Sequence, residues 1–350
     1  MAPIFAFWGT CKRGAATAVY DYANFGERLL GFERPLIICS NSLNGDDASL
    51  KLNLKRLRAR FGADRVFMMK QRWFKGNARR LVPEVDAVLA AHNVTHLYIM
   101  KGGLRDGFLS RLPGVRNCVH AAFSATQPHG CAYARVAASV PTARGVDVPV
   151  ISHVVQRQEA TGDDLRAALG IPQNATVFCR HGGTPTFNIP FVKAAVAQHA
   201  GDEPSAWFLF MNTARFVKEH PRVRFLAPET DDTAKSRFIR SCDAMLHARR
   251  EGETFGLAIA EFSAHNRPVI TSSAHDDRGR ARHHIETLGK RGLYYDSKES
   301  LLRLLRTFDR TAARTGDWRA YTQYAPEVVM QTFRRVFVEA PCLPASSVGQ

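Results

Sequence analysis

The sequence has no apolar run that approaches the roughly 18–20 residues needed to span a bilayer. Its first eight residues are apolar, but no basic residue precedes them, so we expect a buried first strand and not a signal peptide. These features predict a cytoplasmic protein, with peripheral membrane association as a second option.

Paired cysteine motifs are also missing. The seven cysteines are dispersed, and no two of them have Cys-x-x-Cys spacing. An odd, dispersed set predicts a reducing compartment and argues against a disulfide framework or a zinc site. The histidines at 153, 283 and 284 have no companion ligands at metal spacing, and there is no Asp-x-Asp triplet. We therefore expect no metal and no resident cofactor.

Acidic residues are scarce. The chain has 48 Lys and Arg against 32 Asp and Glu, a net charge of +16. Residues 51–80 alone carry eleven Lys or Arg and one acid, Asp64. A solvated helical face explains such a run, and so does an anionic membrane surface or an acidic acceptor. Nucleic acid is a less favoured partner, because the aromatic residues inside the run have the pattern of core positions.

The 350 residues are enough for two domains, and 45% apolar content is a globular value. Buried runs at 4–8, 35–39, 65–69, 96–100 and 117–123 alternate with helical stretches at 14–28, 47–61 and 83–92. From 149 the pattern restarts, with strands at 175–180, 206–211, 222–227, 244–248, 269–272 and 292–295 and helices at 190–199, 233–241, 256–265 and 297–315. This alternation predicts two α/β domains with parallel, doubly wound sheets.

The expected limits are a first Rossmann-like domain at 1–150 and a second at 151–317. Residues 318–338 look helical and are expected to return to the first domain, and 339–350 have the composition of a loose tail.

The most informative motif is Glu253-Thr-Phe-Gly-Leu-Ala-Ile-Ala-Glu261, which lies between two predicted strands. Gly256 stands where a helix should begin, so free N–H groups and the positive end of the helix dipole favour a phosphate there. Carboxylates repel phosphate, but they accept hydrogen bonds from hydroxyls. Phosphate flanked by two such carboxylates describes a nucleotide sugar. The competing interpretation is that Glu253 caps the helix and Glu261 lies on a solvated face.

A second motif follows the strand at 175–180. It reads Arg180-His-Gly182-Gly183, in which the glycines allow close approach of the backbone to a ligand and the arginine can bind a diphosphate. A tight turn with a surface arginine is the alternative. Arg249 and Arg250, just before the Glu253 motif, are further candidates for the diphosphate.

Together these motifs resemble the donor domain of the retaining GT-B nucleotide-sugar glycosyltransferases, the Glu-x7-Glu type (group 1, family 4-like). The resemblance implies a GT-B fold, two Rossmann-like domains facing a cleft. It implies that Glu253 binds donor-sugar hydroxyls at the catalytic centre and that Glu261 binds the ribose. Backbone amides would bind the phosphates of a UDP- or GDP-sugar, at Thr254, Phe255, Gly256 and Leu257. The lysine that the family usually has shortly after the strand-end arginine is missing from 184–188, and Lys193 comes only later.

By the same resemblance the first domain contributes a catalytic histidine at a strand end, His120, with His129 as a second, acceptor-side candidate. A lone histidine there is as often a structural residue. The turn after the first strand, with Gly9, Thr10 and Gly14, would form the acceptor-side floor, although it has no Gly-x-Gly-x-x-Gly fingerprint.

The expected reaction is transfer of a hexosyl or pentosyl group to a hydroxyl acceptor (a glycan, a lipid or a protein-linked sugar). It would proceed with retention of configuration and without a metal, and fixed positive charge would neutralise the diphosphate. Two other functions stay open. One is a nucleotide-sugar epimerase of the same fold, and the other is a non-catalytic basic protein that binds nucleic acid or membrane.

Overall fold

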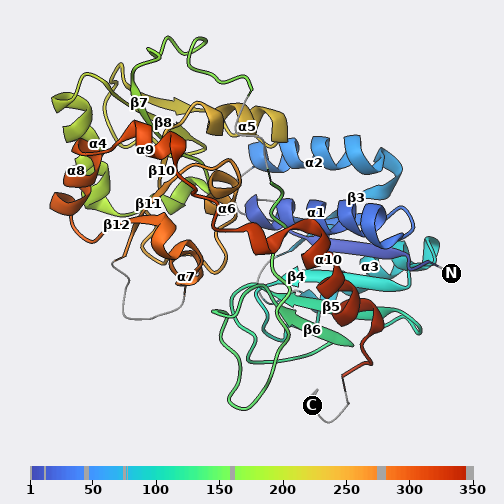
Figure 1. The fold of residues 1–350 in the computed structure, drawn as a ribbon. Helices are drawn as coiled ribbons and strands as arrows, with labels where there is room; N and C mark the ends of the chain where they lie inside the picture. Colours follow the sequence, from blue (N-terminus) through green and yellow to red (C-terminus); the bar gives the residue numbers. More distant parts are fainter. Residues whose placement is uncertain are drawn as a thin grey trace. The chain divides into compact units, whose positions relative to one another are not determined.

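The computed structural model describes residues 2–11, 13–42, 47–73, 76, 78–157, 162–273 and 281–343. Lys75 of the basic segment and residues 344–350 of the expected tail lie outside this part. The chain divides into two compact units (Figure 1). Unit 1 comprises Met1–Val154 and Pro326–Gln350, and unit 2 comprises Val155–Ala325. The two changes of unit, after Val154 and after Ala325, fall four and eight residues after the expected limits at 150 and 317.

Unit 1 contains a six-stranded, wholly parallel sheet in the order β3-β2-β1-β4-β5-β6. All five residues of β1 are buried, as expected for a central strand covered on both faces. The strands are β1 Phe5–Gly9, β2 Leu36–Ser42, β3 Val66–Trp73, β4 His96–Lys101, β5 Arg116–Ala121 and β6 Ala132–Arg135. The helices are α1 Arg13–Leu30, α2 Asp47–Phe61, α3 Ala78–Ala91 and, from the end of the chain, α10 Pro326–Phe333 with a π-helical turn Arg334–Glu339.

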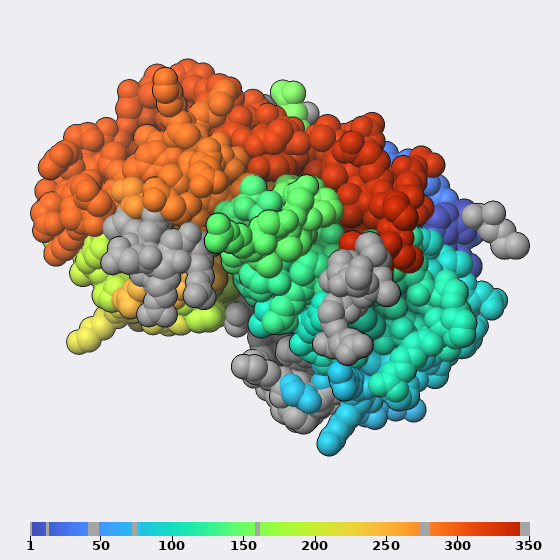
Figure 2. Space-filling model, turned by 90° about the horizontal axis from the view of Figure 1, so that it is seen from below, coloured from blue at the N-terminus to red at the C-terminus, as the bar shows by residue number. Residues whose placement is uncertain are grey.

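The C-terminal segment completes the core of unit 1. The Phe333 ring lies 5.8 Å from that of Phe5, 5.4 Å from that of Tyr22 and 5.7 Å from that of Tyr98, measured between centroids. Figure 2 shows this segment in red against the green and cyan surface of the same unit. A large aromatic side chain buried in this way contributes strongly to stability, so α10 belongs to the first core although it is last in sequence.

Unit 2 repeats the plan, with a parallel sheet in the order β12-β11-β10-β7-β8-β9. Val177 and Cys179 of β7 face one hydrophobic core and Phe178 faces the other, as the two-residue period of a strand requires. The strands are β7 Thr176–Arg180, β8 Ala206–Met211, β9 Val223–Leu226, β10 Ala244–Leu246, β11 Val269–Ser272 and β12 Gly292–Tyr295. The helices are α4 Pro190–Asp202, α5 Asp232–Arg240, α6 Leu257–Ala264, α7 His283–Leu288, α8 Lys298–Arg306 and α9 Arg310–Thr315.

The expected α/β fold with two Rossmann-like units is confirmed. Two short elements, β6 and α7, have no counterpart in the sequence analysis. The single helix expected at 297–315 is in fact two, because the Asp309 side chain accepts hydrogen bonds from the N–H groups of Thr311 and Ala312 and caps a new helix.

The expectation of no disulfide framework is wrong. Three disulfides join Cys11 to Cys39, Cys131 to Cys342 and Cys179 to Cys242, and Cys118 is a buried free thiol. The partners are 28, 211 and 63 residues apart, so the fold and not the local sequence brings them together. The argument from cysteine dispersal for a reducing compartment therefore loses its basis.

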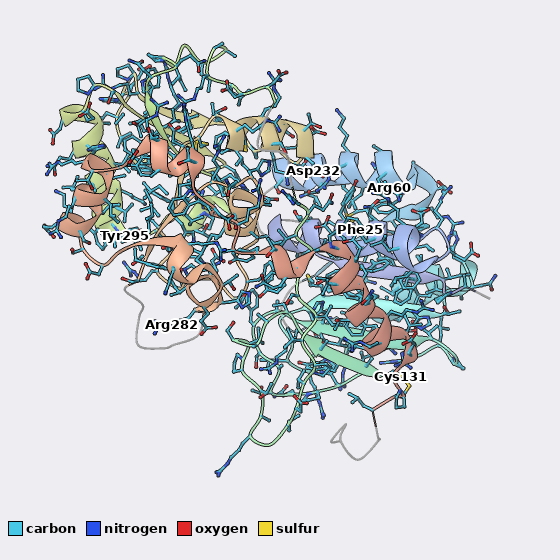
Figure 3. The ribbon with its side chains drawn as sticks, viewed as in Figure 1. Phe25, Arg60, Cys131, Asp232, Arg282 and Tyr295 are labelled. Atoms are coloured by element: carbon cyan, nitrogen blue, oxygen red, sulfur yellow. A yellow bond between two sulfur atoms is a disulfide. The ribbon has the colours of Figure 1, made fainter. Side chains whose placement is uncertain are left out.

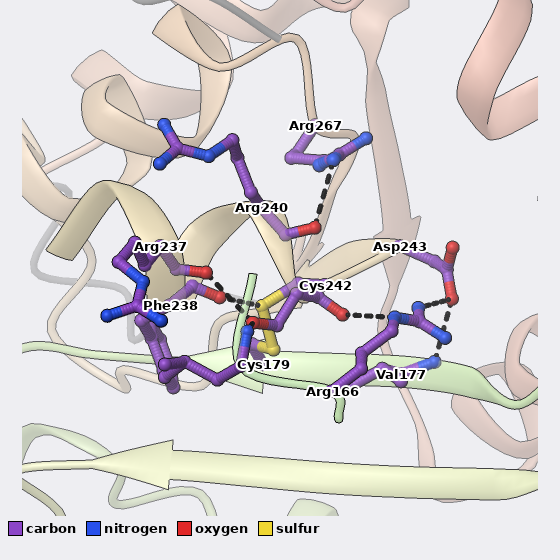
Figure 4. Close-up of a disulfide and its surroundings, with 11 residues drawn as sticks. Arg166, Val177, Cys179, Arg237, Phe238, Arg240, Cys242, Asp243 and Arg267 are labelled. Atoms are coloured by element: carbon purple, nitrogen blue, oxygen red, sulfur yellow. Dashed lines mark hydrogen bonds and ion pairs between the residues drawn. A yellow bond between two sulfur atoms is a disulfide. The ribbon is translucent and has the colours of Figure 1, made fainter. Parts of the chain in front are cut away.

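The Cys179–Cys242 disulfide ties β7 to the segment between α5 and β10 (Figure 4). Beside it Arg166 donates to Asp243 at 2.8 Å, and the Asp243 carboxylate also accepts from the N–H of Val177. Both charged side chains are almost fully buried, and the bond from Val177 to Asp243 joins β7 to the residue before β10, the two strands from which the candidate site extends.

Candidate active site

The candidate site lies at the carboxyl ends of neighbouring strands in unit 2. Met245 of β10 pairs with Cys179 of β7, and Leu246 pairs with Ile270 of β11. In this register His181, the first residue after β7, lies beside His247, the first residue after β10. Both are at the carboxyl ends of their strands, where ligands of open parallel sheets bind.

Two glycines shape the loop between β10 and α6. Gly252 has φ +64°, and a Cβ there would lie 2.2 Å from the carbonyl oxygen of Ala281. Gly256 has φ +88° and immediately precedes α6. Both positions therefore require glycine. The loop is held further by the N–H of Glu253, which donates to Ala281 O at 2.9 Å.

Glu253 is held by one histidine and one arginine. His247 Nε2 lies 3.2 Å from Glu253 Oε1, and Arg249 Nη1 donates to Glu253 Oε2 at 2.6 Å. On its other side His247 Nδ1 lies 2.9 Å from Oγ1 of the fully buried Thr271. Burial favours the neutral acid, but the bond from His247 and the charge of Arg249 outweigh it and lower the pKa of Glu253. The carboxylate is thus ionised and oriented.

Glu261 has a parallel environment. His181 Nε2 lies 2.9 Å from Glu261 Oε2, and Lys235 Nζ donates to Glu261 Oε1 at 2.9 Å. Burial again opposes ionisation, and the charges of Lys235 and His181 overcome it, so the pKa of Glu261 lies well below its usual range. Lys235 also pairs with Asp232, at 3.1 Å. The motif therefore places one ionised carboxylate in the loop before α6 and a second inside that helix, while hydroxyl binding by either one stays a prediction.

Arg180 is buried, and its terminal N–H groups donate to oxygen atoms of the protein. Its Nη1 donates to Asn212 O and Thr213 Oγ1, and its Nη2 donates to Gly183 O and Thr186 Oγ1. Burial lowers the pKa of Arg180 to about 10, against the opposing charge of Glu253. These bonds join the loop after β7 to the loop after β8, so Arg180 shapes the Gly182-Gly183 turn.

The other predicted donor-side residues surround the start of α6. Arg250 is exposed, and its backbone N–H donates to Asn188 Oδ1. Thr254 and Leu257 are half-buried. Phe255 is buried, with its ring stacked 5.2 Å from His283 and its carbonyl accepting from Tyr321 OH. The first amides of α6 have no acceptor within the helix, which leaves this end suited to an anion.

His120, predicted as catalytic, lies in the core of unit 1. It is fully buried, with Nδ1 2.8 Å from Tyr98 OH and Nε2 2.8 Å from Ile151 O. Burial lowers its pKa to about 4. Since both nitrogens are bonded and no surface is exposed, this environment fits the structural alternative for His120.

The predicted acceptor-side residues are also in unit 1. Gly9 ends β1 and closely approaches Val19, Thr10 is half-buried, and Gly14 is exposed in the first turn of α1. His129 is buried, its Nδ1 lies 2.7 Å from Gln127 O, and burial lowers its pKa to about 4.

A cavity of about 750 Å³ opens near His129, between the loops that follow β4, β5 and β6. It is lined mainly by apolar residues of unit 1, among them Pro128, Tyr133, Val146 and Val148, with Arg105 and Asp147 as charged members. It does not include Gly9, Thr10 or Gly14.

Sequence reasoning missed the partners of the two glutamates. His181, Lys235, His247 and Thr271 come from three strand ends and one helix. The available signal was the position of each histidine directly after a buried strand. Among the described residues no three His, Cys, Asp or Glu side chains are grouped so as to hold a metal ion. Within the same ranges no helix is both long and apolar enough to cross a membrane.

No family model matches the chain, and no curated protein matches it either. Solved structures do match over nearly their whole length. They include Anabaena HepE in complex with UDP-glucose, with 15% identity, a TM-score of 0.66, and 95% of this chain and 98% of that one covered. A glycosyltransferase from Rickettsia africae ESF-5 has 13% identity, a TM-score of 0.57, and 95% and 94% covered.

A putative UDP-N-acetylglucosamine 2-epimerase from Listeria monocytogenes is also similar, with 12% identity, a TM-score of 0.59, and 97% and 98% covered. At such identities the likeness establishes a fold, here the two-unit Rossmann-like architecture that these proteins share with this chain. A fold of this kind supports several reactions, so the function has to be argued from the site.

Proposed function

We propose that the protein is a GT-B glycosyltransferase that moves a sugar from a nucleoside diphosphate sugar to a hydroxyl acceptor. One observation carries the proposal. Two ionised carboxylates, Glu253 and Glu261, flank the start of α6, and each is oriented by a histidine and a cation. A helix start attracts phosphate, and the carboxylates accept hydrogen bonds from the sugar and ribose hydroxyls on either side.

The residues divide the donor between them. Glu253 binds hydroxyls of the transferred sugar, Glu261 binds the ribose, and the amides of residues 254–257 bind the diphosphate. In this scheme the glutamates are binding groups and not the acid and nucleophile of a glycosidase. The leaving diphosphate assists the incoming hydroxyl on the same face, so the anomeric configuration is retained. Fixed positive charge, without a metal, stabilises the leaving group.

Structures of the same fold support a uridine nucleotide as the donor carrier, since HepE has been crystallised with UDP and with UDP-glucose. UDP-sugars are therefore the first donors to test, and GDP-sugars the next. Epimerisation of a nucleotide sugar is the second candidate, favoured by the likeness to the Listeria protein. An epimerase needs no acceptor, so dependence of turnover on an added hydroxyl compound separates the two.

The test is nucleotide release from UDP-, GDP-, ADP- and dTDP-sugars, with hydroxyl acceptors present and absent. We expect one donor to turn over only with acceptor, and Glu253→Gln to lower kcat/KM at least about 100-fold, since a neutral amide neither attracts nor orients hydroxyls as a carboxylate does. Glu251→Gln is the matched control, because Glu251 is an exposed carboxylate two residues away that pairs with Asn188. No turnover and no thermal stabilisation by any donor would favour the non-catalytic basic protein.

The basic segment suggests where the acceptor is found. On α2 the exposed side chains of Lys51, Lys55 and Arg58 follow one another at helical spacing and form one basic face. Arg60, labelled in Figure 3, pairs instead with Glu27 of α1 at 2.6 Å. We propose that the exposed face lies on an anionic membrane that presents a glycan, lipid or protein-linked acceptor.

Pelleting with liposomes tests this surface. Wild-type protein should sediment with vesicles that contain phosphatidylserine, and raised salt should release it, because exposed charges are screened. Replacing Lys51, Lys55 and Arg58 by Gln should reduce the bound fraction several-fold, whereas Arg60→Gln should change it little. Equal pelleting on neutral and anionic vesicles would remove the membrane from the proposal.

A further inference from the structure

All four carboxylate oxygens of the Glu253–Glu261 pair already have protein partners. Each glutamate gives one oxygen to a histidine and the other to a cationic side chain, Arg249 for Glu253 and Lys235 for Glu261. A ligand hydroxyl must therefore share or replace one of these contacts. Which partner gives way decides how the site responds to a donor.

Arg249 is the most replaceable of the four partners. Its side chain is 28% exposed, against 12% for Lys235, which is also held by Asp232. His247 is 8% exposed and is fixed from behind by Thr271. The other carboxylate near Arg249 is Glu251, at 3.7 Å. Because Arg249 has the most exposed side chain of these partners, its guanidinium can regain water or bind another anion when a hydroxyl replaces it on Glu253.

The diphosphate meanwhile needs positive charge that the loop after β7 does not supply. The four donor contacts of the Arg180 Nη groups go to protein oxygens, and residues 184–188 contain no lysine. Lys193 lies over the Phe216 ring at 5.8 Å. Arg249 stands four residues before Glu253, on the loop that leads into α6, and its guanidinium can bind two phosphate oxygens at once.

We infer that Arg249 binds the diphosphate of the donor and that, before a donor binds, it is paired with Glu253 instead. When a sugar hydroxyl of the donor binds Glu253 Oε2, the guanidinium leaves that oxygen for the diphosphate, while His247 keeps Oε1 in place. No covalent bond changes, since one N–H···O contact is exchanged for an O–H···O contact and an N–H···phosphate contact. This inference rests on the proposed function and deepens it: the arginine recognises a nucleotide that carries a sugar.

The exchange predicts opposite effects on two ligands. A bare nucleoside diphosphate has no sugar to release Arg249, so Glu253 competes with it for the guanidinium. Glu253→Gln removes the competitor and should tighten binding of the bare nucleotide about two- to fivefold, the range expected for release of one partly exposed ion pair. The same variant should weaken binding of the nucleotide sugar, which loses its hydroxyl acceptor.

The experiment is titration calorimetry with UDP, GDP, ADP and dTDP and their glucose or mannose derivatives. The nucleoside diphosphate that wild type binds most tightly is then compared in Glu253→Gln and in the control Glu251→Gln, which removes the same charge 3.7 Å from the same arginine. We expect the bare nucleoside diphosphate to bind more tightly to Glu253→Gln and with unchanged affinity to Glu251→Gln. An equal increase in affinity in both variants, or no increase in Glu253→Gln, would overturn the inference.

Arg249→Gln gives an independent test should Glu253→Gln fail to fold. It should weaken the nucleotide sugar about tenfold and the bare nucleoside diphosphate less than about twofold, because the arginine serves the diphosphate only after a sugar has released it. Equal losses for the two ligands would mean that Arg249 binds phosphate at all times. If the wild-type protein binds none of these nucleotides, the proposed function is overturned as well. If the wild type turns over a donor but Arg249→Gln loses affinity equally for both ligands, only the movement of Arg249 from Glu253 to the diphosphate is overturned.

Discussion

The orientation of Glu253 depends on a chain of three side chains. A carboxylate can only accept hydrogen bonds, so the contact with Glu253 requires His247 Nε2 to carry a proton. Thr271, fully buried on β11, fixes the ring through Nδ1. Thr271 thus acts on the substrate only through His247 and is a positioning residue.

Although the Thr271 hydroxyl does not contact the substrate in this scheme, its removal should therefore impair catalysis. Thr271→Val keeps the shape of the side chain, and we expect kcat/KM to fall about tenfold, within the range caused by misplacing a binding group. Thr271→Ser retains the hydroxyl and should restore most of the activity. Steady-state kinetics with melting curves decides the point. Equal activity of the Val and Ser variants would leave Thr271 with a packing role only.

The sequence identified the two glutamates but not the residues that hold them. Glu261 was recognisable because a charge in a mostly apolar helix needs a partner. His181 and His247 were not, because their contact with the glutamates depends on the pairing of β7 with β10, and a single sequence does not give strand register. The prediction for His120 rests on the family resemblance alone, and a single sequence does not show that this strand-end side chain lies in a core.

At the scale of elements, the turn between β10 and α6 sets the geometry of the site. Its path depends on Gly252, whose backbone lies close to the carbonyl oxygen of Ala281. It also depends on Gly256, the residue before the helix, which has a left-handed backbone conformation. A Cβ at residue 252 has no room, because the obstacle is backbone and not a flexible side chain.

Gly252→Ala should accordingly lower the free energy of unfolding by about 1–3 kcal/mol and abolish donor binding, since the loop must move away from Ala281. The control is Gly201→Ala in α4, where nothing lies within 4 Å of the added methyl group. This control should stabilise the protein by about 0.5–1 kcal/mol, as is usual for a helical glycine. Urea denaturation and calorimetry measure both effects. Normal donor binding by Gly252→Ala would contradict the argument.

Strands that a clear apolar run marks in the sequence were predictable, even where they are short. The strands at 206–211, 269–272 and 292–295 match the structure at both ends, although the last two have only four residues each. β6 also has four residues, but its sequence Ala-Tyr-Ala-Arg has no run of large apolar residues to mark it, and the six residues of α7 are too few to show a helical period. The break near Asp309 was missed because the residues on both sides of it favour a helix.

For the molecule as a whole, contacts between distant parts of the chain join the C-terminal segment to unit 1. Cys342 is bonded to Cys131 (labelled in Figure 3), and Arg116 donates to the carbonyl oxygens of Phe337 and Ala340. None of these contacts has a local sequence signal. Seven dispersed cysteines allow many pairings, and the pairs become apparent only when the sheet brings their strands together.

The Cys131–Cys342 bond should be a large contributor to stability, because it closes a loop of 211 residues in the unfolded chain. Cys342→Ser should reduce the free energy of unfolding by about 2–5 kcal/mol, mainly by restoring entropy to the unfolded state. Thermal melts of the oxidised wild type and of the variant measure the loss. The loss should disappear when both proteins are melted with reductant, because the wild type then lacks the same bond.

Alkylation of the unfolded, unreduced wild type should label one cysteine in seven, Cys118, while the variant should show two labelled thiols, at Cys118 and Cys131. Seven labelled cysteines in freshly purified wild type would show that the bonds do not form in the cell, and would return the protein to the reducing compartment that cysteine dispersal first indicated.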